Sequence, residues 1–486
     1  MKWVRFFFIL SAAALLAGCM SAQPPTNATT PWTPPKAAQN PDNIWNSARA
    51  QTIDFSKPLT LAELADIALQ NNPVSRKAWN DARAAAAQVS LARGYFMPTL
   101  VANAGASRDK TTAEPDTFDS SFTKYGPGLQ VNYLILNFGG GRKAAVEAAL
   151  QTVYAANYSF NRSIQDILLA VETAYYGSIS AKAGVQAAEA SVQDARIALE
   201  AARIRKSAGA GTELEVLQAQ AVYDQSLYGL ASAQGQALIA RGSLAQAIGA
   251  PADTALRVAE PTVNVADSLK AQDMRKLIDE ALNRRPDIAA LRATLAAKKA
   301  TVKAVGSELW PLLYFNGNAT RNYFKNVSGK ELQDSDWSYG GGLSLQWTLF
   351  DGFQILSAKR IAQAQADSLQ AQLQQAELAA SAEVWTRYHN YETALQKYKF
   401  SAAYLNSASS SYHLALDSYK AGLKSILDLL NAESQLAQAR SQQIASRQET
   451  FIALANLAYS TGLLEKGGSA ENPELFSTST EKDNQP

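Results

Sequence analysis

Hydrophobic and polar residues alternate one by one in two separate stretches of this chain. In the first stretch, the apolar residues Leu129, Val131, Tyr133 and Ile135 alternate with Gln130 and Asn132. In the second, Leu343, Leu345, Trp347 and Leu349 alternate with Ser344, Gln346 and Thr348. A period of two is typical of a strand with one apolar and one polar face. We expect each stretch to pair with a preceding strand, at about 99–107 and 312–322, so that two hairpins lie within 98–137 and 311–350.

A helical pattern fills the longer segments around these hairpins. Residues 128–250 and 312–472 contain no proline and are rich in Ala, Gln, Leu and Glu, which favour helix. They predict helices over about 141–208 and 354–421, each of roughly 65 residues and on the order of 100 Å at 1.5 Å per residue. Shorter return helices are expected over about 212–247 and 425–459. Helices of this length are typical of coiled coils and helical tunnels.

The second half of the chain repeats the first half at a constant offset. Asn72-Pro73 returns as Arg285-Pro286, and Gly209 returns as Gly422; 286 minus 73 and 422 minus 209 both give 213. Chance matches would scatter in offset, so the chain is a duplicated unit of helix, hairpin and long helices. We expect repeat 1 over 59–250, a linker over 251–268, repeat 2 over 269–462 and a disordered tail over 463–486.

The N-terminus has the pattern of an export signal. Lys2 and Arg5 precede an apolar segment that is too short to span a membrane as a mature helix. Residues 16–19 (Leu-Ala-Gly-Cys) have the small residues that precede a lipidated cysteine in bacterial lipoproteins, where Met20 in place of aspartate favours the outer membrane. We expect a signal peptide over 1–18, palmitate-type lipidation of Cys19 and a Pro-rich tether over 19–58. The alternative is an ordinary secretory signal with an incidental cysteine.

The composition and the remaining motifs argue against catalysis and nucleic-acid binding. A net charge of +2 with 18% charged residues provides no basic patch for nucleic acid. Cys19 is the only cysteine, and His389 and His413 lie too far apart on one predicted helix to share a metal. Gly139-Gly140-Gly141 lacks the Lys-Ser/Thr of a phosphate-binding loop. We therefore expect neither an enzyme nor a bound cofactor or metal.

Aromatic residues gather at the ends of the predicted strands, such as Tyr125 and Phe138 in the first hairpin and Trp337 and Phe350 in the second. Rings at strand ends are typical of a bilayer interface. The alternative is an aromatic core beneath a soluble sheet. Four strands cannot close a barrel alone, and open edges in lipid cost several kcal/mol per unpaired group. If the hairpins span a membrane, several chains must therefore share one barrel.

The turn between each long helix and its return helix has a recognisable sequence. Gly209 and Gly422 favour the left-handed conformation that ends a helix. Thr212 and Ser425 are expected to cap the next helices, with Glu215 and Asp428 three residues on as the partners of a capping box. The residues between glycine and cap are expected to be exposed: Ala210, Gly211, Leu423 and Lys424.

With these motifs in this order, the chain resembles the TolC-like outer-membrane factor family, in its lipoprotein branch. The resemblance also includes Leu136-Asn137-Phe138-Gly139 and Leu349-Phe350-Asp351-Gly352 at the strand-to-helix turns. It implies a mainly α fold with a membrane β-barrel portion, in which a homotrimer closes a twelve-stranded barrel on an α-helical periplasmic tunnel. It further implies that the tips dock a periplasmic adaptor, which is linked to an inner-membrane pump, and we expect a pump of the RND type. The expected adaptor contacts are the exposed tip residues Ala210, Gly211, Leu423 and Lys424. The mature N-terminus lacks the Gly-Pro-Asp-Tyr-type opening of that branch, which leaves the partner pump open.

Charged residues near the tips suggest a gate. Three copies of Asp417 in a trimer would form an acidic constriction, held by Arg205 or Tyr419 on neighbouring helices, and would favour cations. The alternative is a solvated helix face. The function expected from all these features is a passive outer-membrane exit duct for drugs and other toxic small molecules, opened by the adaptor. Two alternatives stay open: the duct of an ABC-type protein secretion system, and a lipid-anchored periplasmic coiled-coil scaffold without a pore.

Overall fold

The computed structural model describes residues 27–30, 57–113, 118–261, 274–326 and 336–464. These residues form two compact units, each built from both halves of the chain. The strand unit contains residues 81–156 and 290–373, and the helical unit contains residues 25–80, 157–289 and 374–486. The expected signal peptide, Cys19 and most of the tether lie outside the described residues.

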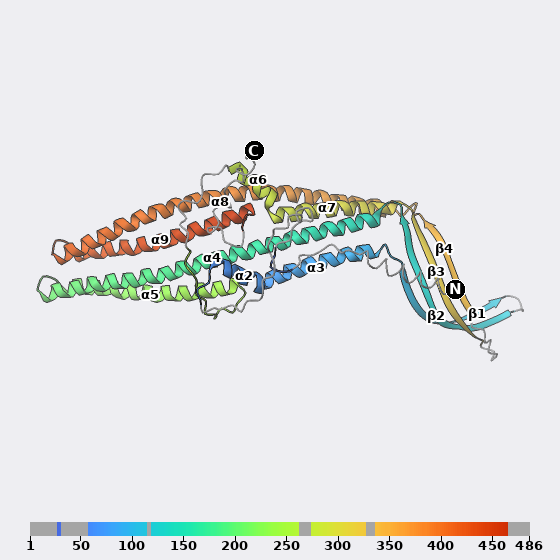
Figure 1. Cartoon of the computed structure of the whole chain (residues 1–486), viewed down its shortest axis with the longest axis horizontal. Coiled ribbons are helices and arrows are strands. Elements are labelled where there is room, and N and C mark those ends of the chain that lie inside the picture. Colours follow the sequence, from blue (N-terminus) through green and yellow to red (C-terminus); the bar gives the residue numbers. More distant parts are fainter. Residues whose placement is uncertain (1–26, 31–56, 114–117, 262–273, 327–335, 465–486) are drawn as a thin grey trace, which may run out of the picture. The chain divides into compact units, whose positions relative to one another are not determined.

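The strand unit holds one antiparallel sheet in the order β1-β2-β3-β4 (Figure 1). Its strands are β1 (Thr99–Ala113), β2 (Phe118–Asn137), β3 (Leu312–Asn326) and β4 (Asp336–Gln346). The two expected hairpins are confirmed, but several strand ends differ from expectation, and β3, for example, ends at Asn326 instead of about 322. β1 extends beyond Ser107 because its polar end pairs with β2 as far as Ala113 opposite Phe118. β4 ends at Gln346, so Trp347 and Leu349 follow the strand instead of belonging to it.

The sheet has one apolar and one polar face, as the period of two predicts. The register places Val131 of β2 opposite Leu100 of β1 and Gly317 of β3, and Phe315 opposite Leu343 of β4, on the apolar face. The other face carries amides and hydroxyls; Asn316 Nδ2 donates to Ser344 Oγ at 3.3 Å. Leu343 is 68% exposed, so none of the described residues covers the apolar face there.

A compact corner joins β2 to α4 (Gly141–Ser207) within the strand unit. The Arg142 guanidinium donates to the carbonyl oxygens of Leu134 at 2.5 Å and Ile135 at 2.9 Å. It also lies 4.6 Å from the ring centroid of Phe96. A Cβ at Gly139 would lie 2.6 Å from the backbone of Ser307, so only glycine allows this close approach. These contacts fix the direction in which the first long helix leaves the sheet.

Two further helices contribute to the strand unit, α3 (Pro73–Gly94) and α7 (Pro286–Gly306), the latter followed by the short 3₁₀ helix η2 (Ser307–Leu309). Ala85, Ala86 and Val89 of α3 pack against Val153 of α4 in a small apolar cluster. Small side chains here allow the two helices to approach closely.

The helical unit contains two long antiparallel hairpins. The first is formed by α4 and α5 (Glu213–Ala247), and the second by α8 (Gln354–Lys420) and α9 (Ile426–Thr461) (Figure 1). Their bounds agree with the expected helices to within about two residues. Among the described residues, none of the helices combines the length and the hydropathy that a membrane span requires.

The core of the helical unit lies where its short helices α2 (Leu61–Asn71) and α6 (Met274–Arg284) meet the long ones. Next to it, Arg285 is buried and donates to Asp287, to Glu383 at 2.7 Å and to the Ser460 carbonyl at 3.2 Å. Burial opposes the charge on Asp287, but the hydrogen bonds and the charge of Arg285 outweigh it and hold the pKa of that carboxyl below its ordinary value. Arg285 thus ties the start of α7 to α8 and α9.

The ordered chain continues slightly past α9. Leu463 and Leu464 are buried in the helical core, which corrects the expectation that the disordered tail begins at 463. Part of the expected linker is bound to the helical unit by hydrogen bonds. Leu59 pairs with Val258 in an isolated parallel bridge, and Tyr175 Oη donates to the Ala259 carbonyl at 2.8 Å. The side chains and backbone groups of these residues contact segments far away in the sequence, and the local sequence does not predict such contacts.

Candidate functional site: the paired helical tips

The two helical hairpins of the helical unit end in turns of the same design. Gly209 and Gly422 have φ angles of 72° and 79°, the left-handed conformation expected for them. Ala210 N donates to the Arg205 carbonyl, and Leu423 N to the Ser418 carbonyl, so the last turn of each long helix is closed by the tip backbone. The tips are therefore rigid turns held by main-chain hydrogen bonds.

The two caps differ, although their sequences are similar. Ser425 Oγ accepts from Asp428 N at 3.2 Å, and the Asp428 carboxylate accepts from Ser425 N at 3.1 Å, which completes a capping box. Hydrogen bonds from the side chain and backbone of Ser425 hold the pKa of Asp428 below its ordinary value. Thr212 Oγ1 accepts from Glu215 N at 3.3 Å, but the expected return bond from Thr212 N is not formed.

Glu215 instead contacts the second hairpin. Its carboxylate accepts from Tyr419 Oη at 3.0 Å. The Arg205 guanidinium donates to the Tyr419 carbonyl at 2.9 Å and to the Ala210 carbonyl at 2.9 Å, and lies 4.9 Å from the Tyr419 ring centroid. We call Arg205, Glu215 and Tyr419 the tip latch, because they join α4, α5 and α8.

The Tyr419 side chain is the centre of the tip latch and is only 1% exposed. Burial, together with the hydrogen bond to Glu215, raises the pKa of Tyr419 to about 12, although Arg205 opposes this shift. The phenol therefore stays protonated at neutral pH and donates to the Glu215 carboxylate. Hydrogen bonds to a charged acceptor in a buried setting are among the stronger ones in proteins.

Asp417 is not part of the tip latch. It is exposed, whereas Tyr419 two residues later is buried, and no hydrogen bond or ion pair of its carboxylate is found among the described residues. The structure thus brings Arg205 and Tyr419 together, but it leaves Asp417, the centre of the expected gate, on a separate helix face. In a single chain it has the position of a solvated residue; its role in a trimer stays a prediction.

The residues expected to contact a partner lie at the surface of the tips. Ala210, Leu423 and Lys424 are exposed, and Gly211 is half-buried. A Cβ at Gly211 would lie 3.1 Å from Lys206 N and 3.2 Å from the Glu215 carboxylate, so a larger residue would press on the tip latch. Exposed apolar and small residues thus lie beside turns that main-chain hydrogen bonds hold, and their contact with a partner stays a prediction.

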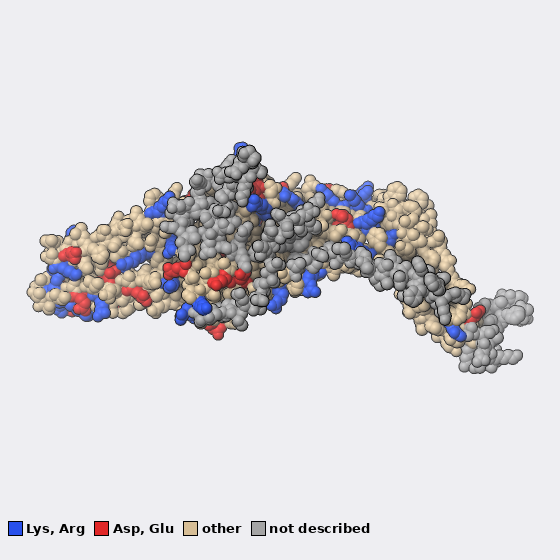
Figure 2. All heavy atoms as spheres, viewed as in Figure 1, with Lys and Arg blue, Asp and Glu red and all other residues tan. Residues whose placement is uncertain are grey.

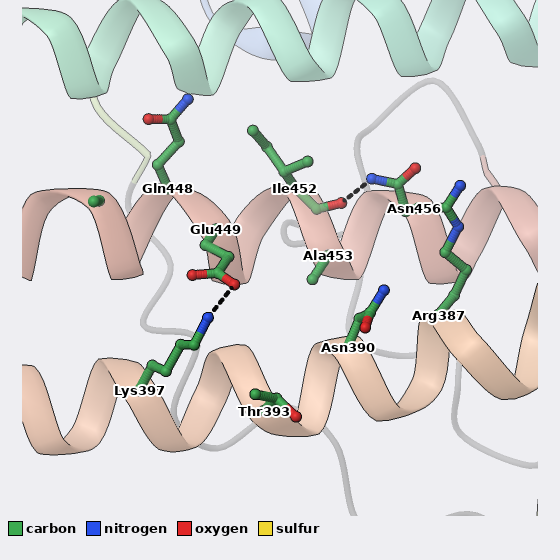
Figure 3. Close-up of a pocket in the computed structure, with 10 residues that line it drawn as sticks. Arg387, Asn390, Thr393, Lys397, Gln448, Glu449, Ile452, Ala453 and Asn456 are labelled. Atoms are coloured by element: carbon green, nitrogen blue, oxygen red, sulfur yellow. Dashed lines mark hydrogen bonds and ion pairs between the residues drawn. The ribbon is translucent and has the colours of Figure 1, made fainter. Parts of the chain in front are cut away.

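A groove of about 510 Å³ lies between α8 and α9, further from the tips. Figure 3 shows Lys397 and Glu449 pointing toward each other across this groove, and Lys397 Nζ donates to Glu449 Oε1 at 2.8 Å. Gln448 points the other way, toward α4 (Figure 3). Because Lys397 and Glu449 neutralise each other, this groove presents a balanced pair of charges at its centre.

The sequence reasoning missed a buried polar cluster on α9. Arg440 Nη1 donates to Asp194 Oδ2 on α4 at 2.7 Å, and Glu433 is buried beside them. The sequence does contain a signal for this cluster. Intervals of three or four residues place one helix face over Ile426, Leu429, Glu433, Leu436 and Arg440. Charged residues on such an apolar stripe indicate buried polar contacts.

The sheet of the strand unit provides a second functional surface. Residues 99–107, 125–137, 312–320 and 337–346 contain no charged residue, and the register aligns them into one band. Figure 2 shows the visible face of this sheet as almost entirely uncharged. Aromatic residues lie exposed at both ends of the band, Tyr339 (83% exposed) and Trp337 at one end and Trp347 and Phe350 at the other. The alternative of an aromatic core beneath a covered sheet is wrong.

Metal chemistry has no support in the part of the chain that the structure describes, where no group of three or more His, Cys, Asp or Glu side chains is placed to hold an ion. His389 Nδ1 contacts Glu392 at 2.9 Å, an ordinary pair one helical turn apart.

A bare apolar sheet with aromatic borders, joined to long helical hairpins, defines an outer-membrane channel protein. The profile of the outer membrane efflux protein family matches residues 64–250 and 277–463, which are the two repeats at their offset of 213. The chain belongs to this family, and its place is the outer membrane. Membership makes it a channel component and not an enzyme.

Named relatives extend over most of the chain. Protein CyaE of Bordetella pertussis is 30% identical over 408 residues, which cover 82% of this chain and 83% of CyaE. The pyoverdine export outer membrane protein OpmQ of Pseudomonas aeruginosa is 26% identical, covering 95% of this chain and 96% of OpmQ. The alkaline protease secretion protein AprF of the same species is 22% identical, covering 82% of this chain and 84% of AprF.

The fold agrees with solved structures. The outer membrane protein VceC of Vibrio cholerae superposes with a TM-score of 0.73 at 21% identity, covering 83% of this chain and 96% of VceC. This likeness confirms the expected fold class.

Proposed function

We propose that this protein is the exit duct of a tripartite efflux system, in which three copies close one barrel in the outer membrane and one helical tunnel beneath it. The protein performs no chemistry; it provides a passage, and a partner pump provides the energy. The observation that carries the proposal is the four-stranded sheet with an uncovered apolar face and free edges at β1 and β4.

The sheet meets the physical requirements of a membrane-spanning segment only when several copies join. Its uncharged band has the length of about 9–11 residues that a tilted strand needs to cross the hydrocarbon layer. The free edges of β1 and β4 would leave backbone groups unpaired in lipid, at several kcal/mol each. Pairing β4 of one copy with β1 of the next removes both edges and places the polar face in the lumen.

The helical unit also presents surfaces that suit packing between copies. α5 exposes Leu217, Tyr228 and Ile239, which recur every eleven residues, and α8 exposes Trp385 and Phe400. Large apolar residues that recur along one helix usually cover a partner surface. In our proposal these stripes face neighbouring copies, because heterologous contacts that close on themselves produce a ring.

The tips are the entrance and the adaptor-binding end of the proposed duct. A periplasmic adaptor, linked to an inner-membrane pump of the RND type, contacts Ala210, Gly211, Leu423 and Lys424. Contact there displaces the tip latch, because Arg205 donates to the carbonyl of the contact residue Ala210 and the Glu215 carboxylate lies beside Gly211. Asp417 is proposed to line the constriction that this movement widens, and Cys19 to carry the lipid that holds the N-terminus at the membrane.

OpmQ and AprF export different cargo, and their names support two versions of the proposal. OpmQ exports pyoverdine, a small molecule, whereas AprF serves the secretion of a protease. We place this chain with the small-molecule ducts, because the OpmQ match covers nearly the whole of both chains.

The test is photo-crosslinking in cells from a probe at Lys424. We expect capture of a periplasmic adaptor, and the pump encoded or purified with that adaptor separates the two versions: an RND pump indicates small-molecule efflux, and an ABC exporter indicates protein secretion. A probe at Glu308, exposed in the strand unit, is the control and should capture no adaptor. Capture of cell-wall components alone at Lys424 would refute the duct and favour the scaffold.

A further inference from the structure

A second groove runs between α4, α5 and α9 in the helical unit, and its lining carries a single negative charge. Its volume is about 720 Å³, within the range of small-molecule sites. Of the described residues that line it, Glu433 is the only one with a charge. The remaining walls are small, polar or aliphatic, among them Ser226, Val222 and Ile444.

Glu433 is held at this groove without a partner. Its side chain is 5% exposed, and Oε2 is fully buried with no hydrogen-bond partner among the described residues. A buried carboxylate oxygen without a partner carries a large desolvation penalty. The same α9 stripe contains Arg440, which is already paired with Asp194 at 2.7 Å. Glu433 is therefore an acceptor that the fold leaves unsatisfied.

Two glycines line the open space of the groove. Gly184 of α4 and Gly229 of α5 line it in the middle of long helices, where glycine is unfavourable. Glycine in a helix is usually explained by close contact with a neighbouring helix. A Cβ at either position would meet no atom within 4 Å, so close packing within the chain does not explain them. Both glycines widen the groove opposite α9.

We propose that this groove binds a small amphiphilic monocation, whose ammonium group pairs with Glu433 and whose apolar body lies along the α4 and α5 walls. A protonated amine neutralises the one charge of the lining. Because Oε2 itself is fully buried, the ammonium group approaches Glu433 through the small part of its side chain that is exposed. An anion would face an uncompensated carboxylate. The site is separate from the tip latch, and it stands or falls independently of the exit-duct proposal.

The groups around Glu433 set the pH at which such binding occurs. Asp194 faces it from α4, Tyr412 from α8 and Arg440 from α9, and the residues that line the groove from α5 are uncharged. Burial, and the negative charge of Asp194, raise the pKa of Glu433 to about 7, while Arg440 opposes the shift. The carboxylate is thus charged above neutral pH and loses its charge below it, so binding of the cation should weaken as the pH falls from 8 to 6.

The test uses the purified full-length protein and a matched pair of probes, 1-naphthylmethylamine, which is protonated at pH 8, and the neutral 1-naphthylmethanol. We expect calorimetry at pH 8 to show the amine binding at least tenfold more tightly than the alcohol. Glu433→Gln, which keeps the shape of the side chain, should abolish this difference. Glu449→Gln, in the neighbouring groove where Glu449 pairs with Lys397, should leave it unchanged.

A second variant tests the location without altering Glu433. Gly229→Leu adds a side chain into the open space of the groove and favours the helix. It should lower the affinity for the amine at least tenfold while the helical content stays the same. Equal affinity of the amine for the wild-type, Glu433→Gln and Gly229→Leu proteins would overturn the proposal, as would equal affinity of the wild-type protein for amine and alcohol.

Discussion

At the residue scale, a few polar contacts join the tips, and they come from segments far apart in the sequence. Tyr419 and Glu215 are 204 positions apart, yet their side chains meet at 3.0 Å. The sequence predicted Glu215 as half of a capping box, because the spacing from Thr212 matches that motif. It could not predict that the Glu215 carboxylate accepts from Tyr419 Oη instead of from the backbone of Thr212, since Tyr419 belongs to the other repeat.

Removal of the Tyr419 hydroxyl should open the tips. Tyr419→Phe keeps the ring under Arg205 but abolishes the hydrogen bond to Glu215, a loss of about 1.5–3 kcal/mol for a bond to a charged group. We expect the time-averaged open probability of the purified protein, measured as conductance in planar bilayers, to rise about tenfold. Tyr404→Phe, which removes a weak contact at 3.5 Å on the same helix, serves as the control. Unchanged conductance of Tyr419→Phe would remove the tip latch from gating.

A parallel change tests Asp417, which the structure leaves outside the tip latch. If three copies of this carboxylate form a constriction, Asp417→Ala should raise the conductance of the closed protein and reduce its preference for cations. The measurement is ion selectivity in a salt gradient. A solvated Asp417 would leave both quantities as they are in the wild-type protein.

Glu433 should make the stability of the helical unit depend on pH. Its pKa is raised from 4.5 to about 7, so folding favours the protonated form. The resulting stabilisation is complete below about pH 4.5 and is lost as the pH rises through 7. Glu433→Gln mimics the protonated form, so its helical circular dichroism should melt at nearly the wild-type temperature at pH 5 and several degrees above it at pH 8. A constant difference between the two proteins from pH 5 to 8 would contradict the raised pKa.

At the element scale, the long helices follow from local sequence and the strand ends do not. Helix formers without proline, together with Gly209 and Gly422 at the turns, were enough to place α4, α5, α8 and α9. The length of β1 and the end of β4 depend on which residues of the neighbouring strand are available for hydrogen bonds. Residues 108–113 are mostly polar and fell outside the strand expected over about 99–107, and only pairing with β2 makes them a strand.

The two faces of the sheet should respond differently to charge. Leu343 lies on the uncovered apolar face of β4, and Ser344 on the polar face. Leu343→Asp would place a carboxylate in lipid and should sharply reduce the folded protein in outer-membrane fractions, measured by heat-modifiable mobility. Ser344→Asp would face the proposed lumen, and we expect it to assemble normally. Equal assembly of the two variants would mean that neither face contacts lipid.

At the scale of the whole molecule, a single chain is incomplete. Among the described residues, no strand pairs with the outer edge of β1 or β4 and nothing covers the apolar face at Leu343, and large apolar residues recur along α5 and α8. The sequence indicated that several chains must join, because four strands cannot close a barrel. The expectation of three copies came from the resemblance to the family, and we could not derive that number from the residues of a single chain.

Disulfide trapping between the free sheet edges tests the central claim most directly. Asn103→Cys on the polar face of β1 is combined in turn with cysteine at Ser338, Gly340, Gly342 or Ser344 on the same face of β4, in cells that retain Cys19. Cα atoms must lie about 4.4–6.8 Å apart for a bond, so few pairs should react. We predict that the reactive pair yields covalent dimers and trimers in the outer membrane and nothing larger. Monomers for every pair, or a ladder that continues beyond three copies, would contradict a closed trimeric barrel.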